Sequence, residues 1–224
     1  MTTTNMPFAR AINAGLRKAM ADDPKVLLMG EDIGDLGGVF RVTEGLKAEF
    51  GANRVVDTPL AESGIIGTAI GLAMRGYRSV CEIQFDGFIF PAYDQIVTQL
   101  AKMHYRSKGR VQLPVVIRVP YAGGIGAVEH HSESPETLFA HVPGLRVVSP
   151  GSAQDAYTMI QEAIACPDPV LFFEPKGRYW EKGPVDLDAP VASATLNKAI
   201  VARAGTDVTL VAYGPTVATA MRVA

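Results

Sequence analysis

The stretch Arg54-Val-Val-Asp57-Thr-Pro-Leu-Ala-Glu62-Ser-Gly-Ile-Ile-Gly-Thr-Ala-Ile-Gly-Leu-Ala-Met74 decides the fold of this chain. Residues 54–57 predict a short strand, and the small and apolar residues 62–74 predict a helix. Residues 79–84 form the next apolar run and predict a second strand. Short apolar strands that alternate with helices are typical of a parallel sheet covered by helices on its faces.

The same alternation extends to both sides of this stretch. We expect further strands at residues 26–29, 114–119, 145–149 and 169–173. We expect helices at residues 7–20, 43–50, about 91–105, near Pro135 and at 153–165. The predicted fold class is therefore α/β with a doubly wound parallel sheet.

The pattern changes near residue 175. Residues 1–175 are expected to form one α/β domain, and residues 176–194, with Pro184 and Pro190, a linker over the surface. Residues 195–224 are expected to begin a second α/β domain, with strands at 197–204 and 208–214 and the first turns of a helix. Because these elements cannot bury a core of their own, we expect the sequence to be a fragment or a short version of a longer polypeptide.

Composition and charge narrow the class of protein. The 224 residues are 48% hydrophobic and 20% charged, with a net charge of −2, as in a soluble globular protein. No basic stripe is present, so we expect neither nucleic-acid nor membrane binding. The N-terminus lacks the basic and apolar regions of an export signal, which predicts a cytoplasmic protein. Cys81 and Cys166 are expected to be buried free thiols.

Glu62 is the first candidate functional residue. Its carboxylate opens an apolar helix, and the sequence offers no cation within several positions. An unpaired carboxylate in an apolar interior costs several kcal/mol unless it is protonated or bound to a ligand. The alternative is that Glu62 only suits the positive end of its own helix dipole. Spacing alone favours neither interpretation.

The second candidate is the glycine-rich loop Tyr121-Ala-Gly-Gly-Ile-Gly-Ala-Val-Glu-His130-His131-Ser-Glu-Ser134. The loop matches neither a dinucleotide fingerprint nor a phosphate-binding loop. Adjacent histidines in a loop point in different directions and rarely bind one metal ion together. One histidine that faces a pocket as an acid, base or donor, and a solvated surface pair, both stay open.

The third candidate is the aromatic stretch of residues 85–93, which follows a predicted strand. Carboxyl ends of strands in open α/β sheets are common ligand sites. One of the rings at Phe85, Phe88, Phe90 and Tyr93 could stack on a planar heterocycle, whereas core packing is expected for most of them.

Several motifs in this order resemble one known family. They are Gly30-Glu-Asp32, Gly37-Gly-Val-Phe-Arg-Val-Thr-Glu-Gly45, Asp57-Thr-Pro-Leu-Ala-Glu62, Ile83-Gln-Phe85, His131-Ser-Glu-Ser-Pro-Glu136 and Asp168-Pro-Val-Leu-Phe-Phe-Glu-Pro175. Together they resemble the beta subunit of the first component of thiamine-diphosphate-dependent 2-oxo acid dehydrogenases. This resemblance implies a pyrimidine-binding α/β domain followed by a C-terminal, transketolase-like α/β domain, much of which lies beyond this sequence.

The resemblance also assigns roles to particular residues. It implies that Glu62 hydrogen-bonds N1′ of the cofactor's aminopyrimidine ring and thereby promotes removal of the thiazolium C2 proton. Phe88 aligns with the aromatic residue that stacks on the pyrimidine, and Glu31 with a residue that supports the same neighbourhood. His131 aligns with the loop histidine that acts in reductive acylation of the lipoyl group.

Metal ions enter through the resemblance as well. A Gly-Asp-Gly…Asn motif holds the magnesium ion of thiamine diphosphate in such enzymes, whereas here Gly34-Asp35 is followed by Leu36. We therefore expect an alpha subunit to hold magnesium and the diphosphate. The resemblance further implies a potassium ion bound mostly by backbone carbonyls, with candidate ligands at Leu113, Val115, Val116, Ala163, Cys166 and Asp168.

The partners implied are an alpha subunit in an α2β2 heterotetramer, a lipoyl-bearing acyltransferase component and a 2-oxo acid substrate. Branched-chain 2-oxo acids are the first expectation and pyruvate the second, because the motifs resemble members of both groups. A non-catalytic α/β interaction module and a self-sufficient transketolase-like enzyme are the alternatives. Glu62 and His131 argue against the first, and the absent diphosphate motif argues against the second.

Overall fold

A six-stranded parallel sheet forms the centre of the protein, in a computed structural model that describes residues 3–191, 196 and 198–224. The strand order is β3-β2-β4-β5-β7-β6. The strands are β2 (Val26–Gly30), β3 (Val55–Asp57), β4 (Arg78–Glu82), β5 (Val115–Tyr121), β6 (Arg146–Val148) and β7 (Val170–Pro175). All neighbouring pairs are parallel, as the alternation of strands and helices predicts.

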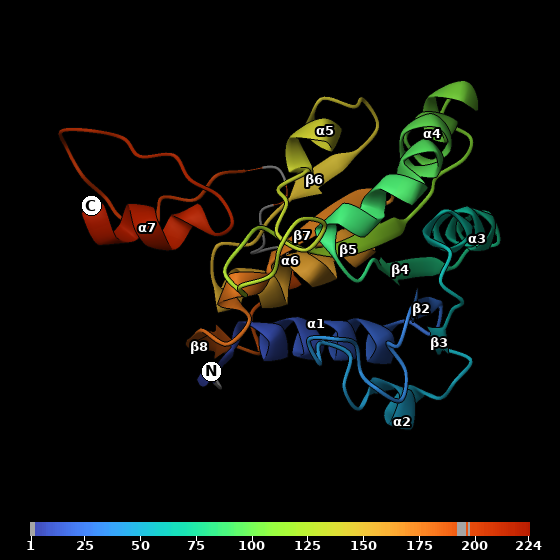
Figure 1. The fold of residues 1–224 in the computed structure, drawn as a ribbon, viewed down its shortest axis with the longest axis horizontal. Helices are drawn as coiled ribbons and strands as arrows, with labels where there is room; N and C mark the ends of the chain where they lie inside the picture. Colours follow the sequence, from blue (N-terminus) through green and yellow to red (C-terminus); the bar gives the residue numbers. More distant parts are fainter. Residues whose placement is uncertain (1–2, 192–195, 197) are drawn as a thin grey trace.

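Helices cover both faces of this sheet (Figure 1). The helices α1 (Phe8–Asp22) and α6 (Ala153–Ala165) pack together on one face. The other face is covered by α3 (Glu62–Met74), the 3-10 helix η1 (Asp86–Ala92), the π-helical segment η2 (Gln95–Leu100), α4 (Ala101–Arg106) and α5 (Glu136–Ala140). The short helix α2 (Leu46–Phe50) precedes β3. The predicted doubly wound architecture is therefore confirmed.

Successive residues of each strand enter different hydrophobic cores. In β2, Leu28 packs in the core beneath α1 and α6, whereas Leu27 packs beneath α3. In β5, Val116 likewise packs in the first of these cores and Ile117 in the second. This alternation follows from the two-residue period of a strand, and burial on both faces explains why the strands are apolar throughout.

The layer formed by α1 and α6 is closely packed. A methyl group on Gly15 of α1 would lie 2.7 Å from the backbone oxygen of Tyr157 in α6, so a larger residue would force the helices apart. The α6 helix has the bounds predicted for residues 153–165, and Ser152 caps it by accepting a hydrogen bond of 3.1 Å from the Asp155 N–H.

The predicted helix at residues 91–105 is wrong in its details. Helical structure begins earlier, in η1, and continues through η2 into α4. Pro91 lies inside η1 rather than at the first turn of a long helix. A short 3-10 segment accommodates a proline because it depends on fewer backbone N–H donors than a continuous α-helix does.

The predicted linker at residues 176–194 is also wrong in part. Residues Lys176–Arg178 form a 3-10 turn, η3, and Lys182–Asp186 form the strand β8. This strand pairs in antiparallel orientation with β1 (Thr3–Pro7), which the sequence did not reveal. Pro184 suggested a loop, but proline is compatible with an edge strand, where its missing N–H faces no neighbour. Residues 192–195 lie outside the described residues.

The two strands predicted at 197–204 and 208–214 are not strands in the described part, 198–214. Many of their apolar side chains are exposed, among them Val201 and Val211. A strand requires a neighbour for its backbone hydrogen bonds, and the described residues provide none here. The helix predicted after them is confirmed as α7 (Thr216–Val223), which extends with this segment away from the sheet (Figure 1). No helix among the described residues is long and apolar enough to cross a membrane.

Candidate functional site

The predicted site residues follow consecutive strands of the sheet. Glu62 follows β3, Glu31 follows β2, Phe88 follows β4, and His131 lies in the loop that follows β5. These strands are neighbours in the order β3-β2-β4-β5. Because the sheet is parallel, all four residues come to its carboxyl edge, where open α/β sheets bind ligands.

Glu31 and Glu62 form a pair of buried carboxylates, each only 7% exposed. The Glu31 Oε1 atom has no hydrogen-bond partner among the described residues. Burial, and secondarily the negative charges of Glu62 and Asp32, raise the pKa of Glu31. No lysine or arginine of the described chain pairs with either carboxylate, which leaves both available to a ligand that donates hydrogen bonds.

The helix-dipole interpretation of Glu62 is only partly supported. Glu62 lies in the first turn of α3, where its charge suits the dipole. However, the N-cap residue is Ala61, and no side chain caps the helix by a hydrogen bond. The dipole therefore accounts for a negative charge at this position but not for its burial beside a second carboxylate.

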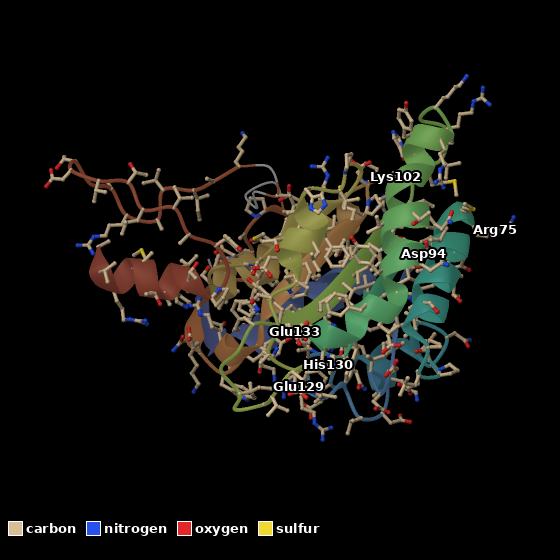
Figure 2. All side chains as sticks on the ribbon, turned by 45° about the horizontal axis from the view of Figure 1, so that its top comes forward. Arg75, Asp94, Lys102, Glu129, His130 and Glu133 are labelled. Carbon is tan, nitrogen blue, oxygen red and sulfur yellow. The ribbon has the colours of Figure 1, made fainter. Side chains whose placement is uncertain are left out.

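Three rings gather where β4 and the glycine-rich loop meet. The His131 ring lies 4.5 Å from the Phe85 ring and 5.2 Å from the Phe88 ring, measured between centroids, in edge-to-face arrangements. His131 Nδ1 lies 3.2 Å from the Glu129 backbone oxygen. The two histidines thus differ in surroundings, because His131 joins aromatic rings while His130 is exposed beside Glu133 (Figure 2). The solvated-pair interpretation fits His130 only.

The remaining aromatic residues mostly pack as expected. Tyr93 packs against Phe139 in the core beneath α5, with ring centroids 5.4 Å apart. Phe90 is 40% exposed, so it is neither a core residue nor part of the three-ring cluster.

A buried charge network lies behind this edge, and the sequence analysis missed it. Arg118 in β5 donates to Glu82 at 2.6 Å and to both oxygens of Glu174, at 2.6 and 2.9 Å. Tyr179 donates to Glu174 at 2.5 Å. Burial raises the pKa of Glu82, and Arg118 opposes that shift. The arginine inside the apolar run of 115–119 was the one local signal that could have revealed the network.

A second buried ion pair was missed for a different reason. Lys176 Nζ lies 2.6 Å from Asp86 Oδ2, and both side chains are fully buried. Burial lowers the pKa of Lys176 and raises that of Asp86, while the pairing opposes both shifts. The two residues are 90 positions apart in the sequence, so no local pattern connects them.

The predicted potassium ligands gather at the opposite, amino edge of the sheet. The Leu113 carbonyl accepts a hydrogen bond from Val115 N–H at 2.8 Å, and Val116 pairs with β7. Arg78 Nη1 contacts the carbonyl oxygens of Ile164, Ala165 and Cys166 at 2.9–3.5 Å.

The other two predicted ligands also have partners within the chain. The Ala163 carbonyl accepts from Cys166 N–H at 3.3 Å, and Asp168 pairs with Arg146 at 3.0 Å. Among the candidate ligands, only the Cys166 carbonyl lies near the Arg78 guanidinium, at 3.5 Å, and the potassium site stays a prediction. No cluster of three or more acidic, histidine or cysteine side chains suited to a metal ion occurs in the described part of the chain.

The cysteines are free, as predicted, but only one is fully buried. Cys81 is enclosed by the core, and burial raises the pKa of its thiol to about 12, so it is no nucleophile. Cys166 is half-buried at the end of α6.

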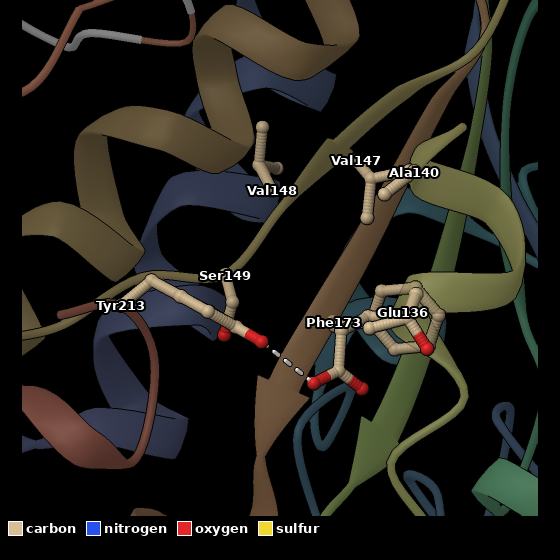
Figure 3. Close-up of a pocket in the computed structure, with 8 residues that line it drawn as sticks. Glu136, Ala140, Val147, Val148, Ser149, Phe173 and Tyr213 are labelled. Carbon is tan, nitrogen blue, oxygen red and sulfur yellow. Dashed lines mark hydrogen bonds between the residues drawn. The ribbon is translucent and has the colours of Figure 1, made fainter. Parts of the chain in front are cut away.

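The best-defined cavity does not contain the predicted site residues. It has a volume of about 250 Å³ and lies between α5, β6, β7 and Tyr213, whose hydroxyl donates to Glu136 at 2.9 Å (Figure 3). Its lining residues are Glu136, Thr137, Ala140, Val147, Val148, Ser149, Phe173 and Tyr213. The candidate site therefore lies apart from this cavity, at the carboxyl edge of the sheet.

Comparison with known proteins places the chain in a family. Residues 4–181 match the family model described as the transketolase pyrimidine-binding domain. A solved "split gene transketolase, inactive beta4 tetramer" superimposes with a TM-score of 0.60 at 20% identity, over 75% of this chain and 50% of that one. This likeness concerns the fold alone. The chain belongs to the transketolase pyrimidine-binding family, as the sequence motifs had indicated.

Closer relatives carry more specific names. The pyruvate dehydrogenase E1 component subunit beta of Leifsonia xyli is 63% identical over 98% of this chain. The 3-methyl-2-oxobutanoate dehydrogenase subunit beta of Mycobacterium tuberculosis is 54% identical over 98%, and the 2-oxoisovalerate dehydrogenase subunit beta of Bacillus subtilis is 45% identical over 93%. The chain spans 62–65% of the length of these relatives.

Proposed function

We propose that this chain is part of the beta subunit of a thiamine-diphosphate-dependent 2-oxo acid dehydrogenase, the component that decarboxylates a 2-oxo acid and transfers the acyl group to lipoyl. The observation that carries the proposal is the pair of buried carboxylates, Glu31 and Glu62, without a cation from the described residues. The names of the relatives support the same class of enzyme.

The residues present fit the pyrimidine half of thiamine diphosphate. An aminopyrimidine ring offers N–H donors and a protonatable nitrogen to carboxylates, and a planar face to an aromatic side chain. The unpartnered Glu31 Oε1 atom and the half-buried Phe88 ring, which follow the neighbouring strands β2 and β4, meet these two requirements. When bound, the cofactor supplies a nucleophilic carbon and an electron sink for decarboxylation.

In this proposal, Glu62 holds a proton at the pyrimidine ring nitrogen N1′. A buried carboxylate without a cation gains most from a ligand that donates a hydrogen bond to it. Burial, and secondarily repulsion from Glu62 and Asp32, raise the pKa of Glu31. Of the two glutamates, only Glu62 begins a helix, and the positive end of that helix dipole offsets part of the negative charge of Glu62. We therefore assign the ring nitrogen to Glu62 and a supporting role to Glu31.

His131 is proposed to move a proton at a lipoyl sulfur. A histidine can give or accept a proton near neutral pH, which transfer of an acyl group to a dithiolane requires. Its loop contains the exposed glycines Gly123, Gly124 and Gly126, so the loop presents little bulk to an incoming lipoyl arm. Phe85 and Phe88 hold the imidazole ring from its sides.

The site is proposed to lie between two chains. The sequence Gly34-Asp35-Leu36 lacks the magnesium motif, and the Asp35 carboxylate instead contacts Lys47 at 2.9 Å. We assign magnesium and the diphosphate to an alpha subunit in an α2β2 assembly, and acyl transfer to a lipoyl-bearing acyltransferase. Two alternatives are weaker. A lone interaction module would give Glu62 and His131 no role, and a self-sufficient enzyme would need the magnesium motif that Gly34-Asp35-Leu36 lacks.

Two substrate classes are supported by specific observations. Branched-chain 2-oxo acids are supported by the relatives named for 3-methyl-2-oxobutanoate and 2-oxoisovalerate. Pyruvate is favoured by the relative that is 63% identical. Co-expression of this subunit with its alpha subunit, followed by a panel of 2-oxo acids and an artificial electron acceptor, decides between them. Activity toward no 2-oxo acid would overturn the proposed function.

Binding of the cofactor tests the shared site separately. We expect the chain alone to bind thiamine diphosphate poorly, and the assembled enzyme to bind it in a magnesium-dependent manner. Isothermal titration calorimetry on both samples measures this difference. Micromolar, magnesium-dependent binding by the chain alone would contradict a site shared between subunits.

A further inference from the structure

The loop that carries His131 touches the helical turn that carries Phe88 at Gly87. The Gly87 N–H donates a hydrogen bond of 3.1 Å to the His130 backbone oxygen. A methyl group added to Gly87 would lie 2.5 Å from His130 Cα and 2.8 Å from His130 Cβ. The backbone of Gly87 has no positive φ, so close approach rather than chain conformation demands glycine here.

The residue before Gly87 is held by the buried ion pair. Asp86 Oδ2 contacts Lys176 Nζ at 2.6 Å, and Asp86 Oδ1 accepts the Gly87 N–H at 3.1 Å. The backbone N–H of Glu133 also faces the Asp86 carboxylate and opposes the rise of its pKa. Asp86 therefore joins three segments: its own turn, the end of the His131 loop and the η3 turn after β7.

The loop is closed at its base as well. The Ala122 N–H donates to the Glu133 oxygen at 2.8 Å, which brings the two ends of residues 122–133 together. Ala122 and His130 both have positive φ, 63° and 64°, a conformation that non-glycine residues rarely adopt. Such a backbone persists only where surrounding contacts determine it. The contact with Gly87 holds His130, and the hydrogen bond to the Glu133 oxygen holds Ala122.

We propose that Gly87, Asp86 and Lys176 form a clamp that fixes the position of His131 against Phe88. They are positioning residues, because they act through the loop backbone rather than on a substrate. The catalytic consequence rests on the proposed function, whereas the clamp itself is a property of this chain. The clamp explains why a buried ion pair and an unsubstituted glycine occur next to an exposed loop.

The Gly87→Ala variant tests the clamp sterically, with the ion pair and both rings left in place. Hydrogen exchange followed by mass spectrometry measures the amides of residues 121–134 in the full chain assembled with its alpha subunit. We expect exchange in this loop to become at least about tenfold faster, because the added methyl group displaces His130. Gly205→Ala is the matched control, since a methyl group there meets nothing within 4 Å. Loop exchange at the wild-type rate in Gly87→Ala would overturn the clamp.

Activity gives the second measurement. A displacement of about 1 Å can cost roughly a hundredfold in rate, so transfer to a lipoyl domain should fall sharply in Gly87→Ala. Decarboxylation with an artificial acceptor should fall less, which lowers the ratio of the two rates. A general loss of folded protein lowers both rates together and leaves the ratio unchanged, and that result counts against a positioning role.

The double variant Asp86→Asn/Lys176→Met tests the same clamp if Gly87→Ala does not fold. It removes both buried charges together, which is tolerated far better than loss of one partner, and asparagine can still accept backbone N–H groups. We expect faster loop exchange, because the loop loses its connection to η3. Wild-type exchange in this folded variant contradicts the proposal. A wrong proposed function gives a different result from a wrong clamp: the wild-type enzyme then decarboxylates no 2-oxo acid, whatever the loop exchange shows.

Discussion

Two sets of buried carboxylates lie near the carboxyl edge of the sheet and differ in their partners. Glu82, Asp86 and Glu174, the paired set, each contact a buried arginine or lysine. Glu31 and Glu62, the unpaired set, have no such cation among the described residues. The chain pairs three buried acids with two buried cations and leaves two other buried acids without one, so burial alone does not define a functional site. In the proposed function, the unpaired set is the place where the cofactor binds.

The largest expected effect comes from breaking the paired set. Arg118→Met leaves Glu82 and Glu174 buried without a cation, so we expect the free energy of unfolding to fall by about 3–5 kcal/mol. Thermal unfolding should show this as a decrease in Tm on the order of 10 °C. Arg203→Met, at an exposed arginine, is the control. A Tm near that of the wild type would mean that the network does not stabilise the fold.

The unpaired set should respond in activity rather than in stability. Glu62→Gln keeps the size of the side chain but removes the carboxylate, and turnover should fall at least about a hundredfold. The Tm should change little, because no cation loses its partner. Steady-state assays of the assembled enzyme measure the effect, with Glu44→Gln at a surface ion pair as the control. Activity close to that of the wild type returns Glu62 to the role of a helix-dipole residue.

His131 should affect one half-reaction more than the other. In His131→Ala we expect transfer to a lipoyl domain to lose at least about tenfold more than decarboxylation with an artificial acceptor, as for a missing proton-transfer group. His141→Ala, an exposed histidine at the end of α5, serves as the control. Equal losses in both assays would instead place His131 in substrate binding or in the first half-reaction.

The smallest expected effect is a change in the pH dependence of stability. The pKa of Glu31 is raised by burial and by Glu62, so the folded state binds its proton more tightly than the unfolded state does. Its stabilising contribution is fully present below the ordinary glutamate pKa of about 4.3, and it is lost as the pH rises through the higher folded value.

Glu31→Gln removes this titration. Without cofactor, the variant's Tm should therefore decline less than that of the wild type between about pH 4.5 and 7.5. Glu129→Gln, at an exposed glutamate, should follow the wild type across the same range. Parallel Tm profiles for Glu31→Gln and the wild type would mean that Glu31 has a partner in solution.

Much of the fold could be predicted from the sequence because its signals are local. The helix at 153–165 and the strand at 26–29 were predicted within one residue of their observed ends, since apolar spacing determines both. The β1–β8 pair was missed because neither segment is apolar and the two are far apart in the chain. The strands predicted at 197–214 failed because an apolar run predicts a strand only where a neighbour exists.

The candidate site, too, could be predicted from the sequence only in its local features. Glu62 stood out because its carboxylate interrupts an apolar stretch, and the motifs indicated Glu31, Phe88 and His131. That these residues follow four adjacent strands depends on the strand order, which the motifs do not encode. Asp86–Lys176 could not be predicted at all, because each residue alone resembles an ordinary surface charge.

The sequence by itself determined the alternation of strands and helices, the two apolar faces of the sheet and the identity of the family. These features depend on residue spacing and on long motifs, which are present before the chain folds. Only the tertiary structure decided which buried carboxylates contact a buried cation and which do not. Pairing at 2.6 Å requires segments distant in sequence to meet at one edge of the sheet, and that meeting is set by strand order and packing.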